Sequence, residues 1–355
     1  MPDSPIPILL VDDSAMARTI LSRIFEKSPD VEVVGTAMDG QEALEMIPKL
    51  EPAVVCTDLH MPVMNGLELT KQIMEQHPRP ILVISNAVQE DDQENVFELL
   101  QAGALDVFPK PRSGAAADYE RVARDLIRKI RVLAGVRVIR KRRRKALGGA
   151  SPGASKPPTI SAQVTPPPAI VAMGASTGGP QAFHAILSEL PADFPAPILC
   201  VQHIGEGFLQ SMVAWLDSKC RLTVRIAEHH ERPAIGTVYF APDALHLDLD
   251  SKGQLSTSDK GPIDGHRPSV TFTFRSVADH FKDRAVGVLL TGMGRDGAEG
   301  LDAIAKARGM TITQNEETCV VFGMPQRAIE LGAAKYVLSL DKIPLKLQQL
   351  CLSRV

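Results

Sequence analysis

Residues 169–187 read AIVAMGASTGGPQAFHAIL, an apolar run followed by a turn of small residues and a stretch with helical character. A short apolar run that passes through a glycine-rich turn into a helix is typical of a buried strand in a parallel sheet. Ser176 stands in that turn, and three interpretations compete for it: close packing of strand and helix, a cradle for phosphate, or a nucleophile. The stretch predicts an α/β fold, and the rest of the chain decides what Ser176 does.

Units of the same kind recur in both halves of the chain. Before residue 133 the apolar runs are ILLVDD, VEVVGTA, AVVCTD, PILVISN and ALDVFPK. From residue 169 a second series contains AIVAMGAS, APILCVQH, AVGVLLTG, MTITQN and KYVLSL, interrupted at 223–262 by shorter runs of β character. Strands that alternate with helices predict two doubly wound parallel sheets, the second with a β insertion.

Between the two series the apolar pattern is lost. Residues 135–168 read GVRVIRKRRRKALGGASPGASKPPTISAQVTPPP, which is basic first, then rich in Gly and Ser, and finally in Pro. Such a composition cannot build a packed core. We therefore predict domains at 1–133 and 169–355, joined by a flexible linker at 134–168. We interpret the basic run at 140–145 as solvated linker, with contact to acidic helices or a membrane surface as the alternative.

The composition is that of an ordinary globular protein. The chain has 355 residues, of which 44% are hydrophobic and 23% charged, and a net charge of −3, which does not favour nucleic acid or an anionic membrane as a partner. Its five cysteines are scattered and form no CxxC pair, which argues against a disulfide framework or a zinc site. No run approaches the ~18 apolar residues of a membrane span. We expect a cytoplasmic protein without membrane insertion.

Charged and hydroxyl side chains follow the apolar runs of the first half. They are Asp12, Asp13, Asp58, Ser85 and Lys110. Any single aspartate after a strand is more often a helix cap or turn residue. Because the carboxyl ends of parallel strands meet at one edge, however, these five side chains should converge. Three carboxylates call for a divalent cation such as Mg²⁺, and Asp58, at the end of the central strand, could accept a phosphoryl group beside Lys110.

The motifs VDDS and TDLHMPVMNG, together with Ser85 and the pair Lys110-Pro111, resemble the receiver domains of two-component response regulators. The resemblance covers residues 6–133. It implies a flavodoxin-like fold, phosphoryl transfer from a histidine kinase to Asp58, and a cis Lys110-Pro111 peptide bond. It also implies a set of site residues: Mg²⁺ ligands Asp12, Asp13, Asp58 and the His60 carbonyl, and switch residues Ser85 and Lys110.

In the second half, Gly174, Ser176 and Gly178 fit the GxSxG turn that exposes a serine between strand and helix. The GKS or GKT of a phosphate-binding loop is missing, which weakens that interpretation. A serine nucleophile needs a base and a group that orients the base. His203 ends APILCVQH and Asp296 follows AVGVLLTG, so all three fall at strand ends of one sheet. The order Ser, His, Asp differs from that of the α/β-hydrolases.

The other histidines of the second half are interpreted as structural or surface residues: His184, His229, His230, His246, His266 and His280. One rival motif remains, because residues 292–297 read GMGRDG, with Glu316 about twenty residues on, which matches a dinucleotide-binding fingerprint. Asp296 would then lie beside a negative pyrophosphate, and the motif comes late in its domain, so we do not favour it.

The segments GASTGG, VQH, GHRPSV, LTGMGRDGAEG and QNEETCVVFGMP, within residues 169–350, resemble the catalytic domain of the chemotaxis protein-glutamate methylesterases. The resemblance implies that Ser176 attacks, that His203 acts as base and then acid, and that Asp296 orients it. Main-chain N–H groups near Thr177 and Met293 would bind the oxyanion.

The implied substrates are γ-glutamyl methyl esters, and also glutamine amides, on the cytoplasmic helices of chemoreceptors, with no cofactor for the hydrolysis. Joined to a receiver, the hydrolase should be gated by phosphorylation of Asp58. A phosphorylation-gated adaptor without enzymatic activity is the alternative, and the substitution Ser176→Ala separates the two.

Overall fold

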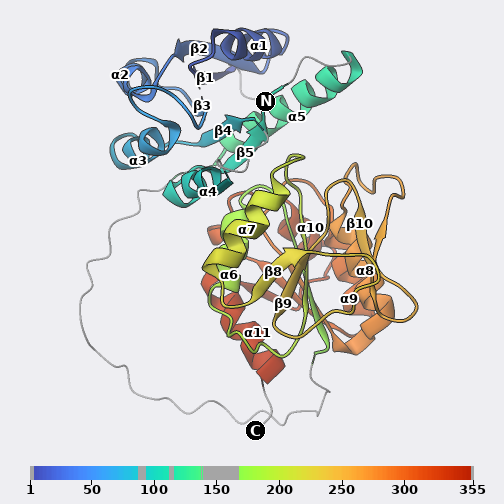
Figure 1. The fold of residues 1–355 in the computed structure, drawn as a ribbon. Coiled ribbons are helices and arrows are strands. Elements are labelled where there is room, and N and C mark those ends of the chain that lie inside the picture. The colour runs from blue at the N-terminus through green and yellow to red at the C-terminus, as the bar shows by residue number, and fades with distance from the viewer. Residues whose placement is uncertain (1–3, 87–92, 112–115, 137, 139–167, 353–355) are drawn as a thin grey trace, which may run out of the picture.

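The computed structural model describes residues 4–86, 93–111, 116–136, 138 and 168–352. Figure 1 shows an N-terminal body in blue and teal above a larger C-terminal body in yellow to red. The predicted linker at 134–168 lies almost wholly outside the described residues, and so does the basic run at 140–145.

The N-terminal body is a five-stranded parallel sheet in the order β2-β1-β3-β4-β5. This is the flavodoxin-like order, so the expected fold is confirmed. The elements are β1 (Ile6–Val11), α1 (Ala15–Glu26), β2 (Val31–Ala37), α2 (Gly40–Leu50), β3 (Val54–Thr57), α3 (Gly66–Gln76), β4 (Ile81–Ser85), α4 (Gln93–Ala102), β5 (Asp106–Pro109) and α5 (Ala116–Ala134).

Both faces of this sheet are covered, which explains why its strands are almost entirely apolar. Successive side chains of a strand point to opposite faces. In β1, Ile8 and Leu10 pack in one core with residues of α1 and α5, whereas Leu9 and Val11 pack in another with residues of α2, α3 and α4. A side chain at the carboxyl end of a strand therefore emerges between two covered faces, where a ligand can reach it.

The C-terminal body is a seven-stranded sheet in the order β14-β13-β12-β6-β7-β9-β8, with a separate two-stranded sheet formed by β10 and β11. Of the predicted β insertion, β8 and β9 extend the parallel sheet, and only β10 and β11 stand apart as an antiparallel pair. The strands are β6 (Ile170–Ala175), β7 (Ile198–Gln202), β8 (Thr223–Ile226), β9 (Thr237–Phe240), β10 (His246–Leu249), β11 (Leu255–Ser258), β12 (Ala285–Leu289), β13 (Met310–Gln314) and β14 (Tyr336–Leu338).

Helices cover both faces of the seven-stranded sheet as well. Met173 of β6 packs in a core with residues of α6, α7 and α11, and Ala172 in the opposite core with residues of α8, α9 and α10. Because β6 lies between β12 and β7, the loops that follow these three strands share one edge. The helices are α6 (Gly179–Leu187), α7 (Leu209–Lys219), α8 (Val270–Phe281), α9 (Ala298–Lys306), α10 (Met324–Glu330) and α11 (Ile343–Leu352).

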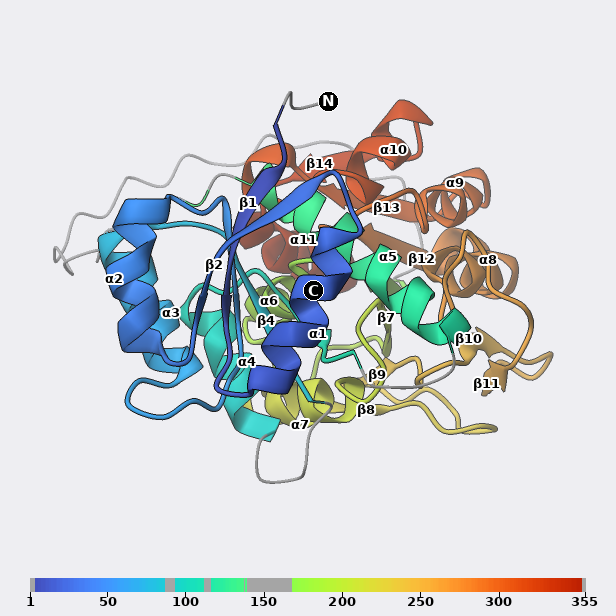
Figure 2. The same cartoon turned by 90° about the horizontal axis from the view of Figure 1, so that it is seen from above.

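The two bodies meet where α4 packs against α6 and α7, as Figures 1 and 2 both show. At this contact the ring of Phe97 on α4 stacks on Trp215 of α7, with ring centroids 5.3 Å apart and planes inclined by 19°. Both side chains are almost completely buried, so the apolar core of one body continues into the other.

One expectation about the backbone is wrong. The cis bond among the described residues is Arg267-Pro268, and Lys110-Pro111 is not cis. The two isomers of an X-Pro bond differ little in energy, so the dipeptide alone does not fix its isomer. Among the described helices, none has the length and apolar character needed to cross a membrane.

Candidate functional site

Ser176 directly follows β6, at the turn that leads into α6. The Ser176 N–H donates to the Thr291 carbonyl, 3.0 Å away, which ties this turn to the loop after β12. Gly178 has φ 77°, and a Cβ added there would lie 2.5 Å from Val320 Cγ2, so the turn requires glycine. The turn therefore holds Ser176, half-buried, at the carboxyl edge of the sheet.

His203 directly follows β7, and its main-chain N–H donates to the Ala175 carbonyl at the end of β6. Its ring atom Nε2 lies 2.9 Å from Asp296 Oδ2. An ionised carboxylate has no hydrogen to donate, so Nε2 carries the proton of this bond and Nδ1 keeps a free lone pair. Nδ1 is buried without a hydrogen-bond partner among the described residues. It is the one ring nitrogen available to take a proton from a neighbouring hydroxyl.

Asp296 is 1% exposed and lies in the loop between β12 and α9. Besides His203, its carboxylate accepts hydrogen bonds from the Ser269 hydroxyl and from main-chain N–H groups, among them those of Val270 and Thr271. Burial alone would raise the pKa of Asp296, but the bond to His203, the charge of His203 and the Thr271 bonds lower it well below its usual value. Asp296 is therefore a fixed negative charge beside the imidazole.

The sequence thus predicted Ser176, His203 and Asp296 at one edge, and the structure brings them there. No hydrogen bond joins Ser176 Oγ to His203 among the described residues. Nucleophile–base hydrogen bonds are often long or poorly aligned without substrate and tighten when it binds. The arrangement can generate a serine nucleophile, provided that the last contact forms on binding.

Thr177 and Met293, the candidates for binding an oxyanion, lie on the two loops that surround Ser176. The Thr291 hydroxyl donates to the Thr177 carbonyl, 2.9 Å away, which fixes the peptide that follows Thr177. A Cβ added at Gly292 would lie 2.8 Å from Ser176 Cβ, so the chain just before Met293 passes directly against the nucleophile. The same close packing leaves no room for a pyrophosphate at Gly292, which argues against the dinucleotide interpretation of GMGRDG.

His266, for which the sequence suggests a structural or surface role, packs against His203. Its ring lies parallel to that of His203, with centroids 3.9 Å apart and planes within 2° of each other. Burial, and then the charge of His203, lower the pKa of His266 to about 4, so this ring is neutral at neutral pH. The sequence signal for this residue was the segment GHRPSV, which begins at Gly265. Ser269, three residues after His266 in the same segment, donates a hydrogen bond to Asp296.

The acidic residues of the first sheet converge as expected. Carboxylate oxygens of Asp12, Asp13 and Asp58 all lie within 4.8 Å of one another. Lys110 Nζ lies 2.7 Å from Asp12 Oδ2 and 2.7 Å from Asp58 Oδ2. Ser85 is 6% exposed at the end of β4, and its carbonyl accepts a bond from the Lys110 N–H.

Burial raises the pKa of Asp58, and the charge of Asp12 acts in the same direction, while Lys110 opposes both. Burial would lower the pKa of Lys110, but its bonds to Asp12 and Asp58 raise it, so its ammonium group stays charged. Clustered hard oxygen ligands fit Mg²⁺, which would favour the ionised form of Asp58. The His60 side chain is exposed, which fits a contribution from its main-chain carbonyl instead of its ring.

Contacts from the first body reach α6, which follows Ser176, and the loops that carry His203 and Asp296. Pro109 Cδ lies 2.7 Å from a Cβ added at Gly205, and Arg128 Nη2 lies 4.0 Å from a Cβ added at Gly294. Gln181 Nε2 donates a hydrogen bond to the Ala104 carbonyl, 2.9 Å away. Gly205 follows His203 by two residues, Gln181 follows Ser176 by five, and Gly294 precedes Asp296 by two. The first body therefore sits against the edge where a substrate would approach.

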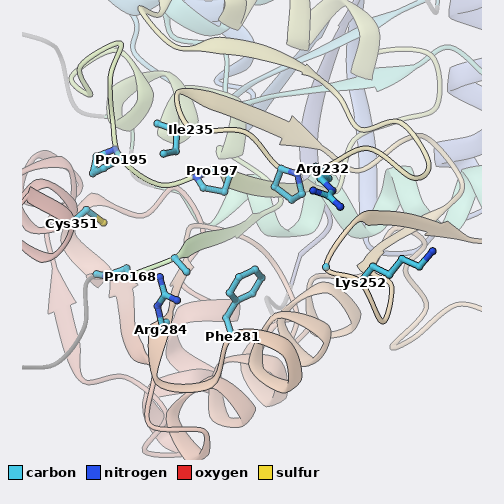
Figure 3. Close-up of a pocket in the computed structure, with 12 residues that line it drawn as sticks. Pro168, Pro195, Pro197, Arg232, Ile235, Lys252, Phe281, Arg284 and Cys351 are labelled. Atoms are coloured by element: carbon cyan, nitrogen blue, oxygen red, sulfur yellow. The ribbon is translucent and has the colours of Figure 1, made fainter.

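A cavity of about 780 Å³ lies elsewhere, as the close-up in Figure 3 shows. Among its lining residues are Pro168, Pro197 and Arg284. Pro197 and Arg284 directly precede β7 and β12, and Pro168 lies two positions before the first residue of β6. The cavity is therefore at the amino ends of the strands, opposite the edge that carries Ser176. It takes no part in the site described above.

Comparisons with known proteins agree with both halves of the chain. The family model described as CheB methylesterase matches residues 171–347, and the one described as response regulator receiver domain matches residues 8–116. A protein-glutamate methylesterase/protein-glutamine glutaminase of Syntrophus aciditrophicus is 44% identical over 95% of this chain and 96% of its own length. One from Nitrosospira multiformis is 40% identical over 98% of both chains.

Among solved structures, the methylesterase catalytic domain of Thermotoga maritima CheB is 44% identical, with a TM-score of 0.50. It covers 52% of this chain, and 98% of its own length is matched.

Proposed function

Because the chain belongs to the family of protein-glutamate methylesterases/protein-glutamine glutaminases, we propose that Ser176, His203 and Asp296 are its catalytic triad. The protein is a hydrolase that demethylates γ-glutamyl methyl esters on chemoreceptors and is regulated by phosphorylation. One observation supports the residue assignment most strongly: the arrangement of the His203 ring. Its Nε2 is hydrogen-bonded to Asp296, whereas its Nδ1, at the strand end next to Ser176, is buried and has no hydrogen-bond partner among the described residues.

In the proposed reaction, Ser176 Oγ attacks the ester carbonyl carbon while His203 Nδ1 takes the hydroxyl proton. Negative charge collects on the carbonyl oxygen, where the N–H groups of Thr177 and Met293 would stabilise it. The tetrahedral intermediate expels methoxide, which leaves as methanol with the proton from His203. Water then attacks the acyl-enzyme with His203 again as base, and Ser176 and a free glutamate are released. A glutamine amide would follow the same path with ammonia as the leaving group.

Asp296 supports both proton transfers without changing its own protonation state. Its carboxylate holds the tautomer in which Nδ1 is the base, and it stabilises the imidazolium that forms during each step. The low pKa of Asp296 keeps its carboxylate charged at neutral pH. No metal or cofactor is needed for this chemistry.

We further propose Asp58 as the phosphoryl acceptor, with a histidine kinase as donor. Asp12, Asp13, Asp58 and the His60 carbonyl would hold Mg²⁺, which when bound would neutralise charge on the transferred phosphoryl oxygens. Lys110 contacts Asp58 directly and would move to the new phosphoryl group. The Ser85 hydroxyl, at the neighbouring strand end, would donate a hydrogen bond to it and so report its presence.

The regulation we propose is obstruction by the receiver. Its contacts with α6 after Ser176, with the loop after His203 and with the loop before Asp296 support this interpretation. A chemoreceptor helix bundle is far larger than a single side chain, so a body docked at this edge would exclude it. Phosphorylation of Asp58 would weaken the docked state and expose the edge.

We propose domain boundaries at 1–133 and 169–355, with the linker at 134–168. The end of α5 at Ala134, the start of β6 at Ile170 and the ranges of the two family matches support them. The partners are the cytoplasmic domains of methylated chemoreceptors and a histidine kinase. A cytoplasmic location fits these partners and five free cysteines.

The residue assignment is tested by methanol release from membranes that contain methylated chemoreceptors. Wild-type protein should release methanol, and Ser176→Ala should release it no faster than membranes alone. Binding of Ser176→Ala to the same membranes serves as a control for folding and docking. Methanol release at the wild-type rate by Ser176→Ala would rule out Ser176 as the nucleophile.

A further inference from the structure

Gln202, the last residue of β7, joins the turn that carries Ser176 to the strand end that carries His203. It is 3% exposed. Its side-chain Nε2 donates to the Ser176 carbonyl and to the His203 carbonyl, each at 2.8 Å. A primary amide nitrogen has two hydrogens, so these two bonds use its full donor capacity. One buried amide thus bonds both residues that exchange the catalytic proton.

The bond to Ser176 also fixes the direction of a neighbouring N–H. The Ser176 carbonyl and the Thr177 N–H belong to one planar peptide unit, in which they point in opposite directions. The Gly179 N–H donates to the same carbonyl at 2.8 Å, so this oxygen is held from two sides. The next peptide is held as well, because Thr291 donates to the Thr177 carbonyl. The Thr177 N–H therefore has a fixed direction before any substrate binds.

The orientation of the Gln202 amide is itself determined. Its Oε1 is buried and has no hydrogen-bond partner among the described residues. It lies against Gly179, where an added Cβ would be 1.9 Å from it. Rotation of the amide by half a turn would place this oxygen against two carbonyl oxygens, which cannot donate to it. A buried amide oxygen without a hydrogen-bond partner destabilises the fold. This orientation is nevertheless the favourable one, because it lets Nε2 form both of its hydrogen bonds.

We propose that Gln202 is a positioning residue that aligns the oxyanion donor Thr177 N–H with the base His203. This inference rests on the proposed function, since it takes Ser176 and His203 as the catalytic pair. Gln202 is buried and bonds main-chain carbonyl oxygens instead of the Ser176 hydroxyl or the His203 ring, so its contribution should be to the transition state and not to receptor binding. Interactions of this kind lower kcat when they are lost and leave KM nearly unchanged.

The test uses Gln202→Met, which keeps the length and approximate volume of the side chain and removes both donors. Thr311→Val is the matched control, because Thr311 is also buried, at 1% exposed, and its hydroxyl also makes a hydrogen bond, accepting from the Lys335 N–H. Thr311 lies near the amino end of β13, away from the edge that carries Ser176. For Gln202→Met we expect kcat for methanol release to fall about tenfold or more, with KM within about twofold of wild type. The melting temperatures of the two variants should fall by similar amounts, with kcat unchanged in Thr311→Val.

A second variant guards against a simple folding defect. Gln202→Glu has the same shape, but its carboxylate faces two carbonyl oxygens with no donor, so its kcat should fall at least as far. Unchanged kcat in either folded Gln202 variant overturns the proposal, as does a rise in KM with kcat unaffected. Failure of the triad assignment is recognised separately, because it requires methanol release by Ser176→Ala and involves no Gln202 variant.

Discussion

In the proposed reaction His203 takes part in two proton transfers, and three neighbouring residues restrict its position. The His203 ring is hydrogen-bonded to Asp296 through Nε2, and the ring of His266 stacks on one of its faces. The main-chain carbonyl of His203 accepts a hydrogen bond from Gln202. The first two contacts restrict the imidazole ring, and the third restricts the main chain that carries it. What remains is a single lone pair, on Nδ1, at the strand end next to Ser176.

The substitution Asp296→Asn tests the tautomer. The Ser269 hydroxyl and the N–H groups of Thr271 and Gly297 donate to Oδ1, whereas Oδ2 faces His203 and the Val270 N–H. An amide here would therefore keep its oxygen at the Oδ1 position and turn its NH₂ toward His203. His203 would then carry its proton on Nδ1, where it cannot accept one from Ser176. We expect kcat for methanol release to fall about 10³- to 10⁴-fold. A fall of less than about tenfold, in protein with wild-type circular dichroism, would contradict this role.

His266 predicts a pH dependence of stability. Its pKa is 6.5 when unfolded and about 4 when folded, so between these values the unfolded chain binds the proton and the native protein does not. The resulting stability is fully present above pH 6.5 and is lost as the pH falls toward 4. His266→Phe keeps a flat ring against His203 and should lose less stability in this window. The measurement is urea unfolding at several pH values, and identical pH profiles for the two proteins would contradict the assignment.

At the scale of elements, glycines set how closely the strands and helices approach. Gly178 combines φ 77° with contact to Val320. Gly332 has φ 70° but no atom within 4 Å of an added Cβ, so it isolates the effect of backbone strain. Gly332→Ala should destabilise the protein by about 1 kcal/mol, and Gly178→Ala by more, with reduced kcat because the Ser176 turn must move. Equal destabilisation by both substitutions, measured by thermal unfolding, would show that the Val320 contact is unimportant.

The elements were largely predictable from the sequence, whereas contacts across loops were not. Apolar runs such as ILLVDD and APILCVQH indicated strands because both faces of each sheet are covered, and they placed Asp12 and His203 at strand ends. The stacking of His266 on His203 depends on how the loop before α8 folds back over the sheet, which no local pattern encodes. The same holds for the amide of Gln202, since a glutamine at the end of a strand is usually a surface residue.

At the scale of the whole molecule, the receiver and the hydrolase share an apolar contact. Phe97 of α4 stacks on Trp215 of α7. If the docked receiver obstructs that edge, weaker docking should release activity without any phosphorylation.

Phe97→Ala tests this link. Loss of the stacked aromatic contact should weaken docking by about 2 kcal/mol, or about 30-fold in the docking equilibrium. The basal rate of methanol release should therefore rise several-fold, while stimulation by a phosphoryl donor shrinks. Phosphorylation of Asp58 in the variant shows that its receiver remains folded. A basal rate equal to that of wild type would mean that this contact does not restrain the enzyme.

The central claim is that a phosphorylated receiver uncovers a serine esterase. It is tested most directly by methanol release from methylated receptor membranes with and without phosphoramidate and Mg²⁺, comparing wild type with Asp58→Asn. We predict that the donor and Mg²⁺ together raise the wild-type rate about tenfold or more and leave the rate of Asp58→Asn unchanged. Equal rates for the wild type with and without the donor, or equal stimulation of Asp58→Asn, would contradict it.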